Sequence, residues 1–597
     1  MQRLMTDYEL ICARRERVSG LYHVALLICL SVSLSISLCS CTREVEQRRA
    51  GVLTLSLEQH SAWVRLFNPF SPNARRFTRA GIYEPLLIKN SVTGEYTPWL
   101  ATGYQWSDTY TELTLSIRPG VRFSDGAPLT AQDVVYSFEL LRRHPALDTQ
   151  GLWTVLKRVH VSAPMQVSFE LNAPNKPKLD DIAHHPIVPQ HIWREVKDPV
   201  TFTNPTPIAT GPFTEVTTFR AQLYELGRNP HYWRAGQPKL RALRFPAFPS
   251  NDQANLALVT GEVDWAGNFV PAIERTFVAA DPQHNVYWFP LIGSMVNLIP
   301  NTTRPLLSDA RVRKALSLAI NRQRLVEVAM YGYTRPADST GLSDGFLREH
   351  DQRVAREYPW TEYQPDRAEA LLREAGLIKE DGQWRRSDSA SAPLKLTIEV
   401  VSGWSDWVRA AQVIASDLRS IGIPVQVKTR EFSAWFDRLS SGQFELAIGW
   451  ADDRGSLYQY YKWLMSEQTV KPIGEAAVGN FHRFGDREVD QWLEQLKRGA
   501  DPDLERALNQ KLQRRYAELA PVIPLFPNPQ WGAASTRRAQ GFPSAASPYA
   551  PLSPNREPEC LLVLTQLTPV QSPDVTSDTT SGPASRGSTE GVRGGTL

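Results

Sequence analysis

The stretch VVSGWSDWVRAAQVIASDLRSIGIPVQVK, residues 400–428, decides the fold class of this chain. It continues an apolar run, LKLTIEVV (394–401), that reads as a buried strand, and residues 406–421 have the spacing of an amphipathic helix. Gly422 can take the left-handed backbone conformation that ends a helix, and the following IPVQVK is predicted to be a second strand. Because a strand, a helix and a strand in this order place the two strands parallel, an α/β protein is predicted.

Two tryptophans stand where the first of these strands passes into the helix. Trp404 directly follows Ser402-Gly403, and Trp407 lies inside the first helical turn. In βαβ units ligands collect at the carboxyl ends of the strands, where the helix presents its N-terminal N–H groups. We therefore expect Trp404 to face a binding crevice and Trp407 to pack into the core.

The alternation of strands and helices extends over residues 51–567. VLTLSLE (52–58) alternates apolar and polar residues, which predicts a half-buried strand. ELTLSIRPGVRFSDG (112–126) predicts a hairpin that turns at Pro119-Gly120.

Three helices are predicted from their end signals. Thr130 is expected to cap a helix over AQDVVYSFELLRR, and Ser308 is expected to cap one that runs to Met330. A third helix is predicted between Pro365 at its start and Gly376 at its end.

Length and composition limit the class of protein. A chain of 597 residues is too long for one hydrophobic core, so two or three lobes are expected. The net charge is only +3 and no basic block is present, which argues against nucleic-acid binding. The chain has 17 Trp, 19 Tyr and 22 Phe. Aromatic side chains at this density either pack in hydrophobic cores or bind sugars and extended peptides.

The N-terminus predicts export. An arginine-rich segment precedes LYHVALLICLSVSLSISLCSC (21–41), and this order is typical of a secretory signal peptide. The exit LCSC resembles the lipobox of bacterial lipoproteins, which implies cleavage before Cys41 and a diacylglycerol on its sulfur. Residues 1–40 are thus interpreted as the signal and 41–50 as a tether, with the protein lipid-anchored to a bacterial membrane outside the cytoplasm. An uncleaved signal anchor is the alternative.

The remaining cysteine and the C-terminus carry little chemistry. Of the five cysteines, three would leave with the signal, Cys41 would be acylated and Cys560 would stay alone, so no disulfide is predicted. Residues 568–597 are rich in Ser, Thr, Gly and Pro and are predicted to be disordered.

The sequence gives no support for a metal-dependent or a nucleotide-hydrolysing enzyme. His184, His185 and His191 follow Asp180 and Asp181 at spacings that a metal site could use, but they are interpreted as structural. The sequence has no HExxH and no P-loop motif. We therefore predict no catalytic residue, no metal, no cofactor and no enzymatic activity.

Several stretches, in order, resemble the extracytoplasmic solute-binding proteins of ABC importers, in the oligopeptide, dipeptide and nickel group known as family 5. They are IYEPLL (82–87), SIRPGVRFSDGAPLTAQDVVYSFE (116–139), ATGPF (209–213), LGRNPHYWRAGQPKLRALRF (226–245), TGEVDW (260–265), LSDARVRKALSLAINRQRLVEVAMYGY (307–333), YQPDRAEALLREAG (363–376) and PVIPLF (521–526).

The resemblance implies a two-lobed periplasmic-binding-protein-like fold of type II, with three subdomains and a two-strand hinge. Lobe I is expected over 51–296, completed by about 535–567, and lobe II over 297–534. Members of this family enclose a ligand between the lobes and present it to a membrane permease that has ATPase subunits. A monomer is expected.

One pattern within this family favours peptides. In peptide-binding members an aspartate soon after a Gly-Trp pair binds the free α-amine of the ligand. In this chain FELAIGWADDRGS (444–456) places Asp453 at the matching distance from Gly449-Trp450. A charge pair of this kind stabilises the complex only where the cleft excludes water.

Another pattern resembles the oligosaccharide-binding members, which carry a Gly-Trp-Thr/Ser-Asp-Trp segment like SGWSDW here. YQYYKWLM, PIGEAAVGNFHRF and PSAASPYAPLSP extend this likeness through the C-terminal half, although Phe481 and Phe542 stand where tryptophan is expected. An indole face stacks on a pyranose ring while polar groups bind its hydroxyls. The candidate ligand-binding residues, in addition to Asp453, are Trp404, Trp450, Tyr458, Trp463 and Trp531.

Two rival classes stay open. A lipid-anchored hydrolase of oligosaccharides could place its two carboxylates anywhere among 63 acidic residues, because spacing in sequence does not fix spacing in space. A ligand-sensing receptor subunit could use the same fold.

Overall fold

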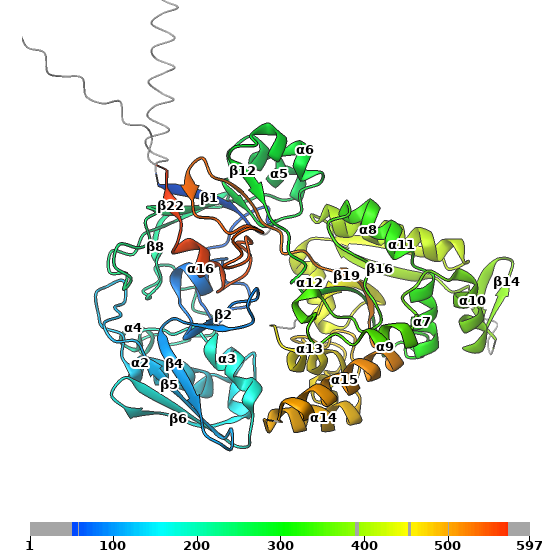
Figure 1. Ribbon diagram of the computed structural model, residues 1–597, viewed down its shortest axis with the longest axis horizontal. Helices are drawn as coiled ribbons and strands as arrows, with labels where there is room; N and C mark the ends of the chain where they lie inside the picture. The colour runs from blue at the N-terminus through cyan, green and yellow to red at the C-terminus, as the bar shows by residue number, and fades with distance from the viewer. Residues whose placement is uncertain (1–50, 58, 388–392, 452–454, 500, 571–597) are drawn as a thin grey trace, which may run out of the picture.

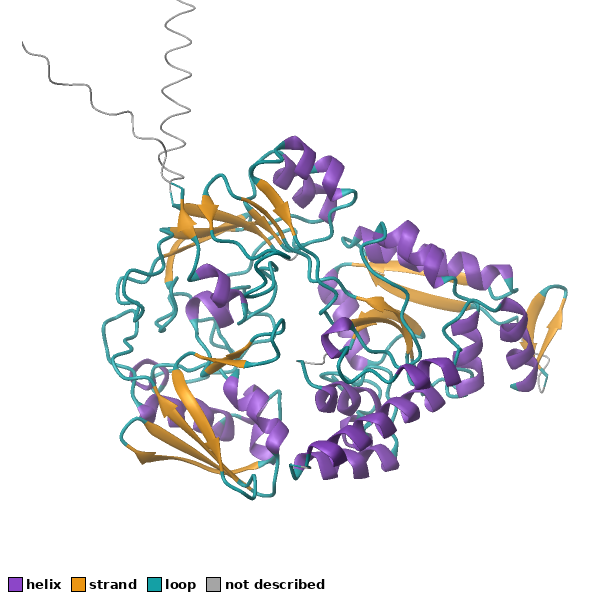
Figure 2. Ribbon diagram, viewed as in Figure 1, coloured by secondary structure: helices purple, strands orange, loops and turns teal. Residues whose placement is uncertain are grey.

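The computed structural model describes residues 51–57, 59–387, 393–451, 455–499 and 501–570, which form two lobes joined by two crossing segments (Figure 1). The expected signal peptide with Cys41 and the tether lie outside these residues, as does Asp453. Helices flank the sheet of the second lobe, whereas strands and loops predominate in the first (Figure 2).

The first lobe is built on a seven-stranded sheet. Its order is β12 (Asn285–Tyr287), β20 (Ala533–Ser535), β11 (Trp265–Ala266), β1 (Val52–Ser56), β10 (Ala242–Pro246), β9 (Leu223–Gly227) and β8 (Glu215–Arg220). β1 pairs in parallel with β10 and with β11, and all of its residues are buried. The predicted half-buried strand is therefore wrong, because a central strand between parallel neighbours is covered on both faces.

A second, four-stranded sheet completes the lower part of this lobe. Its order is β4 (Ala101–Trp106), β5 (Glu112–Ile117), β7 (Gln166–Leu171) and β6 (Leu156–Ala163). The predicted hairpin over 112–126 is wrong, because β5 pairs with β4 and β7 and has no free edge for the residues that follow. Pro119-Gly120 does turn the chain, and the loop beyond is closed by a bond from Leu129 N to Val121 O (2.9 Å).

Helix α2 (Ala131–Arg143) covers the four-stranded sheet and begins as predicted. Thr130 and Asp133 form a capping box, in which the N–H of Thr130 donates to Asp133 Oδ2 at 2.9 Å. Val134, Phe138 and Leu141 lie on its buried face. Short elements follow in this lobe: β2 (Leu87–Lys89), β3 (Tyr96–Pro98), α3 (Leu179–Ala183), α4 (Gln190–Trp193), α5 (Asn251–Val259) and α6 (Ile273–Thr276).

The second lobe contains the predicted βαβ unit. Its sheet has the order β17 (Val425–Arg430), β16 (Leu396–Val401), β18 (Leu446–Trp450), β13 (Met295–Pro300) and β19 (Ile523–Pro527). β16 and β17 run parallel and are connected by α11 (Ser405–Ser420), as expected. Gly422 ends the helix with a φ of +91°, and a Cβ there would lie 2.2 Å from the carbonyl oxygen of Gly382.

Two helices replace the single one predicted from Ser308 to Met330. They are α7 (Ala310–Leu318) and α8 (Arg322–Met330), capped by Asp309 and Asn321. The side chain of Asn321 accepts the N–H of Arg324 at 3.0 Å, so a polar residue inside the pattern starts a second helix. The helix from Pro365 forms as predicted, and this lobe contains α9 (Gln352–Glu357), α10 (Pro365–Glu374), α12 (Phe432–Ser441), α13 (Leu457–Met465), α14 (Arg487–Lys497), α15 (Pro502–Leu519) and the hairpin β14 (Leu377–Glu380) and β15 (Gln383–Arg386).

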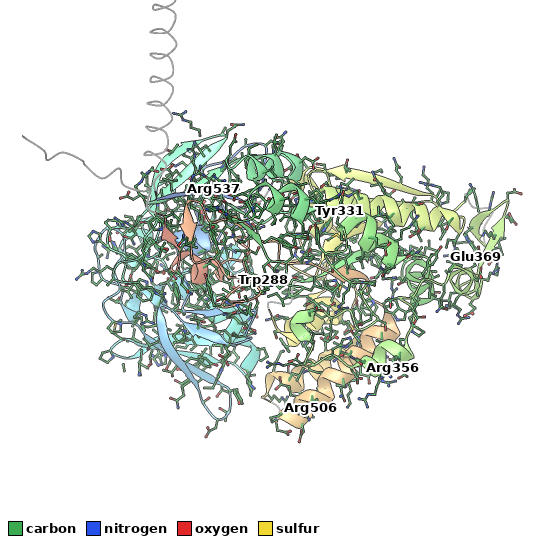
Figure 3. All side chains as sticks on the ribbon, turned by 45° about the horizontal axis from the view of Figure 1, so that its top comes forward. Trp288, Tyr331, Arg356, Glu369, Arg506 and Arg537 are labelled. Carbon is green, nitrogen blue, oxygen red and sulfur yellow. The ribbon has the colours of Figure 1, made fainter. Side chains whose placement is uncertain are left out.

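Two antiparallel segments, 288–294 and 528–532, connect the lobes. Trp288 N donates to Gly532 O (2.9 Å), and Asn528 N donates to Ser294 O (3.0 Å). Trp288 lies where the chain passes between the lobes in Figure 3. These two segments form the hinge of an α/β fold with two lobes.

The C-terminal part returns to the first lobe. β20 joins the seven-stranded sheet, and α16 (Cys560–Leu564) is buried in the core. β21 (Ala539–Gln540) pairs with β22 (Thr568–Pro569), so the first residues of the expected disordered tail are folded.

The lobes touch on both sides of the space between them. Beside the hinge, Asn251 N donates to Gly403 O at 3.1 Å. At the far edge, a Cβ on Gly499 would lie 2.2 Å from Cε2 of Tyr110, so the Gly499 backbone rests on that ring. The structure is therefore a closed form. Within the described ranges, no helix is long and apolar enough to cross a membrane.

Candidate functional site

A cavity of about 550 Å³ lies between the lobes. The first lobe contributes residues from four separate parts of the chain, around 69–94, 141–186 and 553–559 and at Gly267. The hinge contributes both crossing segments, and the second lobe contributes Ser343, Gly345, Phe346 and Gly455. A molecule in this cavity would contact both lobes and the hinge together.

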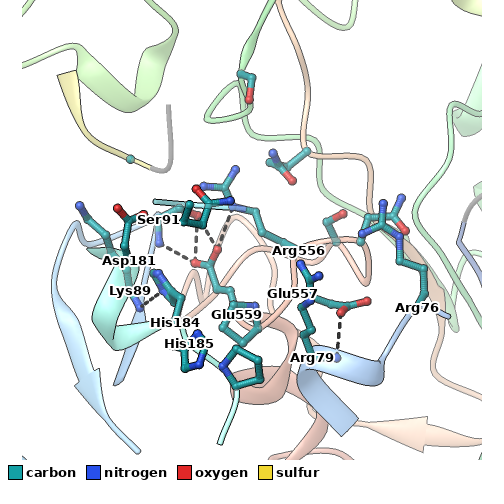
Figure 4. Close-up of a pocket in the computed structure, with 18 of the residues that line it drawn as sticks. Arg76, Arg79, Lys89, Ser91, Asp181, His184, His185, Arg556, Glu557 and Glu559 are labelled. Atoms are coloured by element: carbon teal, nitrogen blue, oxygen red, sulfur yellow. Dashed lines mark hydrogen bonds and ion pairs between the residues drawn. The ribbon is translucent and has the colours of Figure 1, made fainter. Parts of the chain in front are cut away.

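Two glutamates hold the floor of the cavity (Figure 4). Glu559 accepts the backbone N–H of Ser91 at 2.5 Å, the hydroxyl of Ser91 at 2.9 Å and Nε of Arg556 at 3.0 Å. Glu557 accepts the N–H of Phe77 at 2.6 Å and that of Arg79 at 3.2 Å. Burial raises the pKa of both carboxyls, although these donors favour their charged forms. Both glutamates therefore tie the C-terminal segment to loops near the N-terminus.

Ion pairs line the edge of the cavity near α3. Lys89 Nζ lies 3.3 Å from Asp180 Oδ1, and Lys178 Nζ lies 2.7 Å from Asp181 Oδ2. All four side chains are mostly buried, so solvent screens these pairs less than surface pairs. Tyr96 also donates its hydroxyl to Asp180.

The histidines near this edge point to different partners. His185 is buried with Nε2 3.2 Å from Ser137 O, and burial lowers its pKa to about 4. His191 lies 2.7 Å from Asp125. Among the residues that the structure describes, no group of three His, Cys, Asp or Glu is arranged to hold a metal ion.

Trp531 is the candidate that lines the cavity. It is the last but one residue of the second crossing segment, and its ring meets Phe289 and Phe269 edge to face at 4.8 and 5.3 Å between centroids. The hinge therefore presents an indole held by two other rings.

Trp404 and Trp450 belong to an aromatic wall in the second lobe, outside the residues that border the cavity. This wall consists of Trp404, Trp407, Phe432, Trp435, Phe436 and Trp450. Trp404 is half-buried and meets Trp407 at 4.8 Å, while Trp407 is buried in the core as expected. Phe432 lies 6.3 Å from the ring of His60 in the first lobe, so the wall reaches the lobe junction.

Tyr458 and Trp463 lie on α13 and do not border the cavity either. Tyr458 is buried, and burial raises its pKa. Trp463 is covered by Gly479, where a Cβ would lie 2.5 Å from Cδ2 of the indole. Gly455, just after the region of Asp453, does line the cavity.

The charged floor was not predicted from the sequence. Its residues come from segments that lie hundreds of positions apart, such as Ser91 and Glu559. The one local signal is NREPE (555–559), a charged run directly before the buried residues of α16.

Comparisons with known proteins agree with this architecture. The sequence model of bacterial extracellular solute-binding proteins, family 5 Middle, matches residues 95–471. The crystal structure of a mannohexaose-bound periplasmic oligopeptide-binding protein of an oligopeptide ABC transporter from Thermotoga maritima is 26% identical, with a TM-score of 0.79, over 87% of this chain and 99% of that one.

Curated relatives have varied ligands in their names. The di/tripeptide-binding protein 2 of Pseudomonas aeruginosa is 27% identical over 72% of this chain and 80% of its own length. The nickel-binding periplasmic protein of Escherichia coli is 25% identical over 64% of this chain and 73% of its own length. The family match, the two lobes and the cavity between them lead to one conclusion: the chain belongs to the bacterial extracellular solute-binding proteins of family 5, the solute-binding components of ABC importers.

Proposed function

We propose that this protein captures an oligomeric solute, an oligosaccharide or an oligopeptide, between its lobes and delivers it to the permease of an ABC importer. The observation that carries this proposal is the cavity of about 550 Å³ between the lobes, whose walls come from both lobes and the hinge. A ligand shifts a two-state equilibrium only by binding one state better than the other. Contacts to both lobes give the closed state that advantage, and the permease would recognise the closed state.

Two observations favour an oligosaccharide. Trp531 presents an indole in the cavity, and ring faces of this kind stack on pyranoses; the aromatic wall around Trp404 and Trp450, outside the residues that border the cavity, is proposed as a second such surface. The relative of known structure with 26% identity over 87% of this chain holds mannohexaose.

The oligopeptide is the second candidate. A relative of similar identity is named for di- and tripeptides. The floor and the edge of the cavity carry charged groups, among them Lys89, Asp181, Arg556 and Glu559, and charged groups are what bind peptide termini. Asp453 would then bind the α-amine.

The protein would act outside the cytoplasm as a monomer, anchored by lipid on Cys41. Intact-mass analysis of membrane-extracted protein tests the anchor, since acylation adds the mass of the lipid and Cys41→Ser removes it. The proposal includes no catalysis, and an unchanged oligomer length after prolonged incubation is the expected result.

Calorimetry of the purified chain tests the capture. Cello-, xylo- and mannooligosaccharides are titrated in one series, and a pool of tri- to pentapeptides in another. Sugar binding that weakens in Trp404→Ala and persists in Asp453→Asn supports the oligosaccharide. Peptide binding that is lost in Asp453→Asn supports the peptide, and no binding in either series contradicts the proposal.

A further inference from the structure

On the side away from the hinge, the lobes meet through a tyrosine of the first lobe and a glycine of the second. Tyr110 lies in the turn between β4 and β5, and Gly499 follows the end of α14. A Cβ on Gly499 would lie 2.2 Å from Cε2 of Tyr110, 2.5 Å from Cδ2 and 2.9 Å from Cζ, so the glycine backbone rests against one side of the ring. In Figure 1 the four-stranded sheet and α14 face each other at the lower edge of the molecule, away from the crossing segments.

The ring of Tyr110 is held in place by its own lobe. Trp106 packs on it with 5.8 Å between ring centroids, and Lys176 Nζ lies 5.7 Å from its centroid. The backbone N–H of Tyr110 donates to Ser107 O at 2.9 Å, and its carbonyl oxygen accepts the N–H of Asn175 at 3.1 Å. These contacts keep Tyr110 at a φ of +52°, a left-handed conformation that a residue with a Cβ rarely takes. Backbone strain of this kind is concentrated at clamps and switches.

The second lobe offers a surface without a side chain at this place. Gly499 has a φ of +74°, and its N–H donates to Leu496 O at 3.2 Å as α14 ends. Glycine takes this conformation without steric cost, whereas any other residue would place its Cβ among the ring atoms of Tyr110. The two lobes therefore meet here by shape, and the fit depends on the missing Cβ.

Other contacts surround this one along the same rim. Helix α14 contacts the short turn Lys176–Lys178 of the first lobe. Beside the cavity, Gly455 of the second lobe has a φ of +68°, and a Cβ there would lie 3.4 Å from Cε of Lys89 in the first lobe. At two points of the rim, then, a side chain of the first lobe lies on a left-handed glycine of the second.

The position of the Tyr110 contact gives it a large effect on opening. The lobes turn about the segments 288–294 and 528–532, and points far from a hinge separate most for a given rotation. A contact at the far rim is thus broken early in the opening movement. The contact between Asn251 and Gly403 lies beside the hinge, where the same rotation moves the atoms less.

We propose that Tyr110 and Gly499 form a rim clasp, a contact that holds the lobes closed and slows the release of the bound oligomer. The inference rests on the proposed function, because the clasp retains a solute only if the lobes enclose one. The clasp exists in the closed form alone. It therefore lowers the dissociation rate and leaves the association rate of the open form nearly unchanged.

Calorimetry with mannohexaose, cellohexaose, xylohexaose and a pool of tri- to pentapeptides identifies a probe that binds, and stopped-flow fluorescence measures its rates. Tyr110→Ala removes the ring and is expected to raise the dissociation rate about tenfold. Tyr104→Ala is its control, because Tyr104 lies on β4 of the same sheet and packs on Tyr96 of its own lobe.

The glycine is tested by the opposite change. Gly499→Ala places a Cβ against the ring and is expected to weaken binding at least as much as Tyr110→Ala does. Gly382→Ala is its control, because Gly382 has a φ of +76°, lies between β14 and β15 of the same lobe, and has nothing within 4 Å of a Cβ. Both alanines therefore carry the same backbone strain, and only one meets the first lobe.

The double variant separates a clasp from two independent effects. Once the ring is removed, the Cβ at position 499 has room, so Gly499→Ala in the Tyr110→Ala background should weaken binding no more than Gly382→Ala does. Residues that act only within their own lobes would give additive losses. Thermal melting checks the folding of each variant, and Tyr110→Ala against Tyr104→Ala decides the question if Gly499→Ala does not fold.

The outcomes distinguish this proposal from the capture function. If the wild type binds a probe, and Tyr110→Ala releases it as slowly as Tyr104→Ala does, the clasp is overturned and capture stands. Additive losses in the double variant overturn the clasp in the same way. If the wild type binds none of the probes, both proposals are overturned.

Discussion

Asn251 of the first lobe and Asp406 of the second meet beside the hinge, with Nδ2 of Asn251 3.4 Å from Oδ1 of Asp406. Both side chains are buried, and the backbone of Asn251 also donates to Gly403 at 3.1 Å. This contact ties the start of α11, where Trp404 lies, to the first lobe.

Asn251→Ala is therefore expected to favour the open form. Since closure contributes to ligand affinity, binding of the transported oligomer should weaken severalfold in calorimetry, while the melting temperature changes little. The matched control is Asp252→Ala, which removes the exposed side chain of the next residue. Equal affinity in both variants would show that this contact does not bias the lobes.

Glu84 makes the stability of the first lobe depend on pH. It is buried and accepts the indole N–H of Trp99 at 2.7 Å, that of Trp233 at 3.0 Å and the hydroxyl of Tyr232 at 2.9 Å. Burial outweighs these donors and raises its pKa from 4.5 to about 7. The folded state thus binds more protons than the unfolded state between these values.

The free energy of unfolding should consequently fall as pH rises from about 4.5 to about 7, by on the order of 3 kcal/mol from this residue. Urea unfolding across this range measures the slope. Glu84→Gln should flatten the slope, and parallel curves for the variant and the wild type would contradict the assignment.

Gly211 allows two loops of the first lobe to touch. Its N–H donates to Ile82 O at 2.8 Å, and a Cβ there would lie 2.3 Å from the carbonyl oxygen of Gly81. Gly211→Ala is expected to lower the free energy of unfolding by about 1–3 kcal/mol or more. Gly103→Ala, where a Cβ meets nothing within 4 Å, should have a far smaller effect in the same melts.

Glu559 is expected to stabilise the floor of the cavity. Glu559→Ala leaves the backbone N–H of Ser91 and the guanidinium of Arg556 without this acceptor, which should cost about 1–3 kcal/mol. Chemical unfolding measures this cost against Glu195→Ala, a control whose side chain is 75% exposed. A loss no larger than that of the control would mean that the floor does not depend on this carboxyl.

Local signals predicted much of the fold. The βαβ unit around Trp404 and the capping box of Thr130 follow from residues within a few positions of each other. Predictions failed where a distant neighbour decides, as in β1, which is paired along both edges by β10 and β11 and is buried throughout by segments that the local pattern does not reveal. The single helix predicted from Ser308 is wrong because Asn321, which lies within the apolar stripe, caps a second helix.

The site was less predictable than the fold. Trp531 lines the cavity, but the predicted Trp404, Trp450, Tyr458 and Trp463 do not border it in this closed form. The residues that do, such as Ser343 and Asn555, meet only through the folding of segments more than two hundred positions apart.

Small-angle X-ray scattering of the purified chain tests whether an oligomer is held between closing lobes. The radius of gyration is measured without ligand and with a saturating oligosaccharide or peptide that calorimetry has shown to bind. We expect a smaller radius with ligand, and a scattering curve in that state that matches the closed form described above. An unchanged radius at proven saturation, with a curve that differs from the closed form, would contradict it.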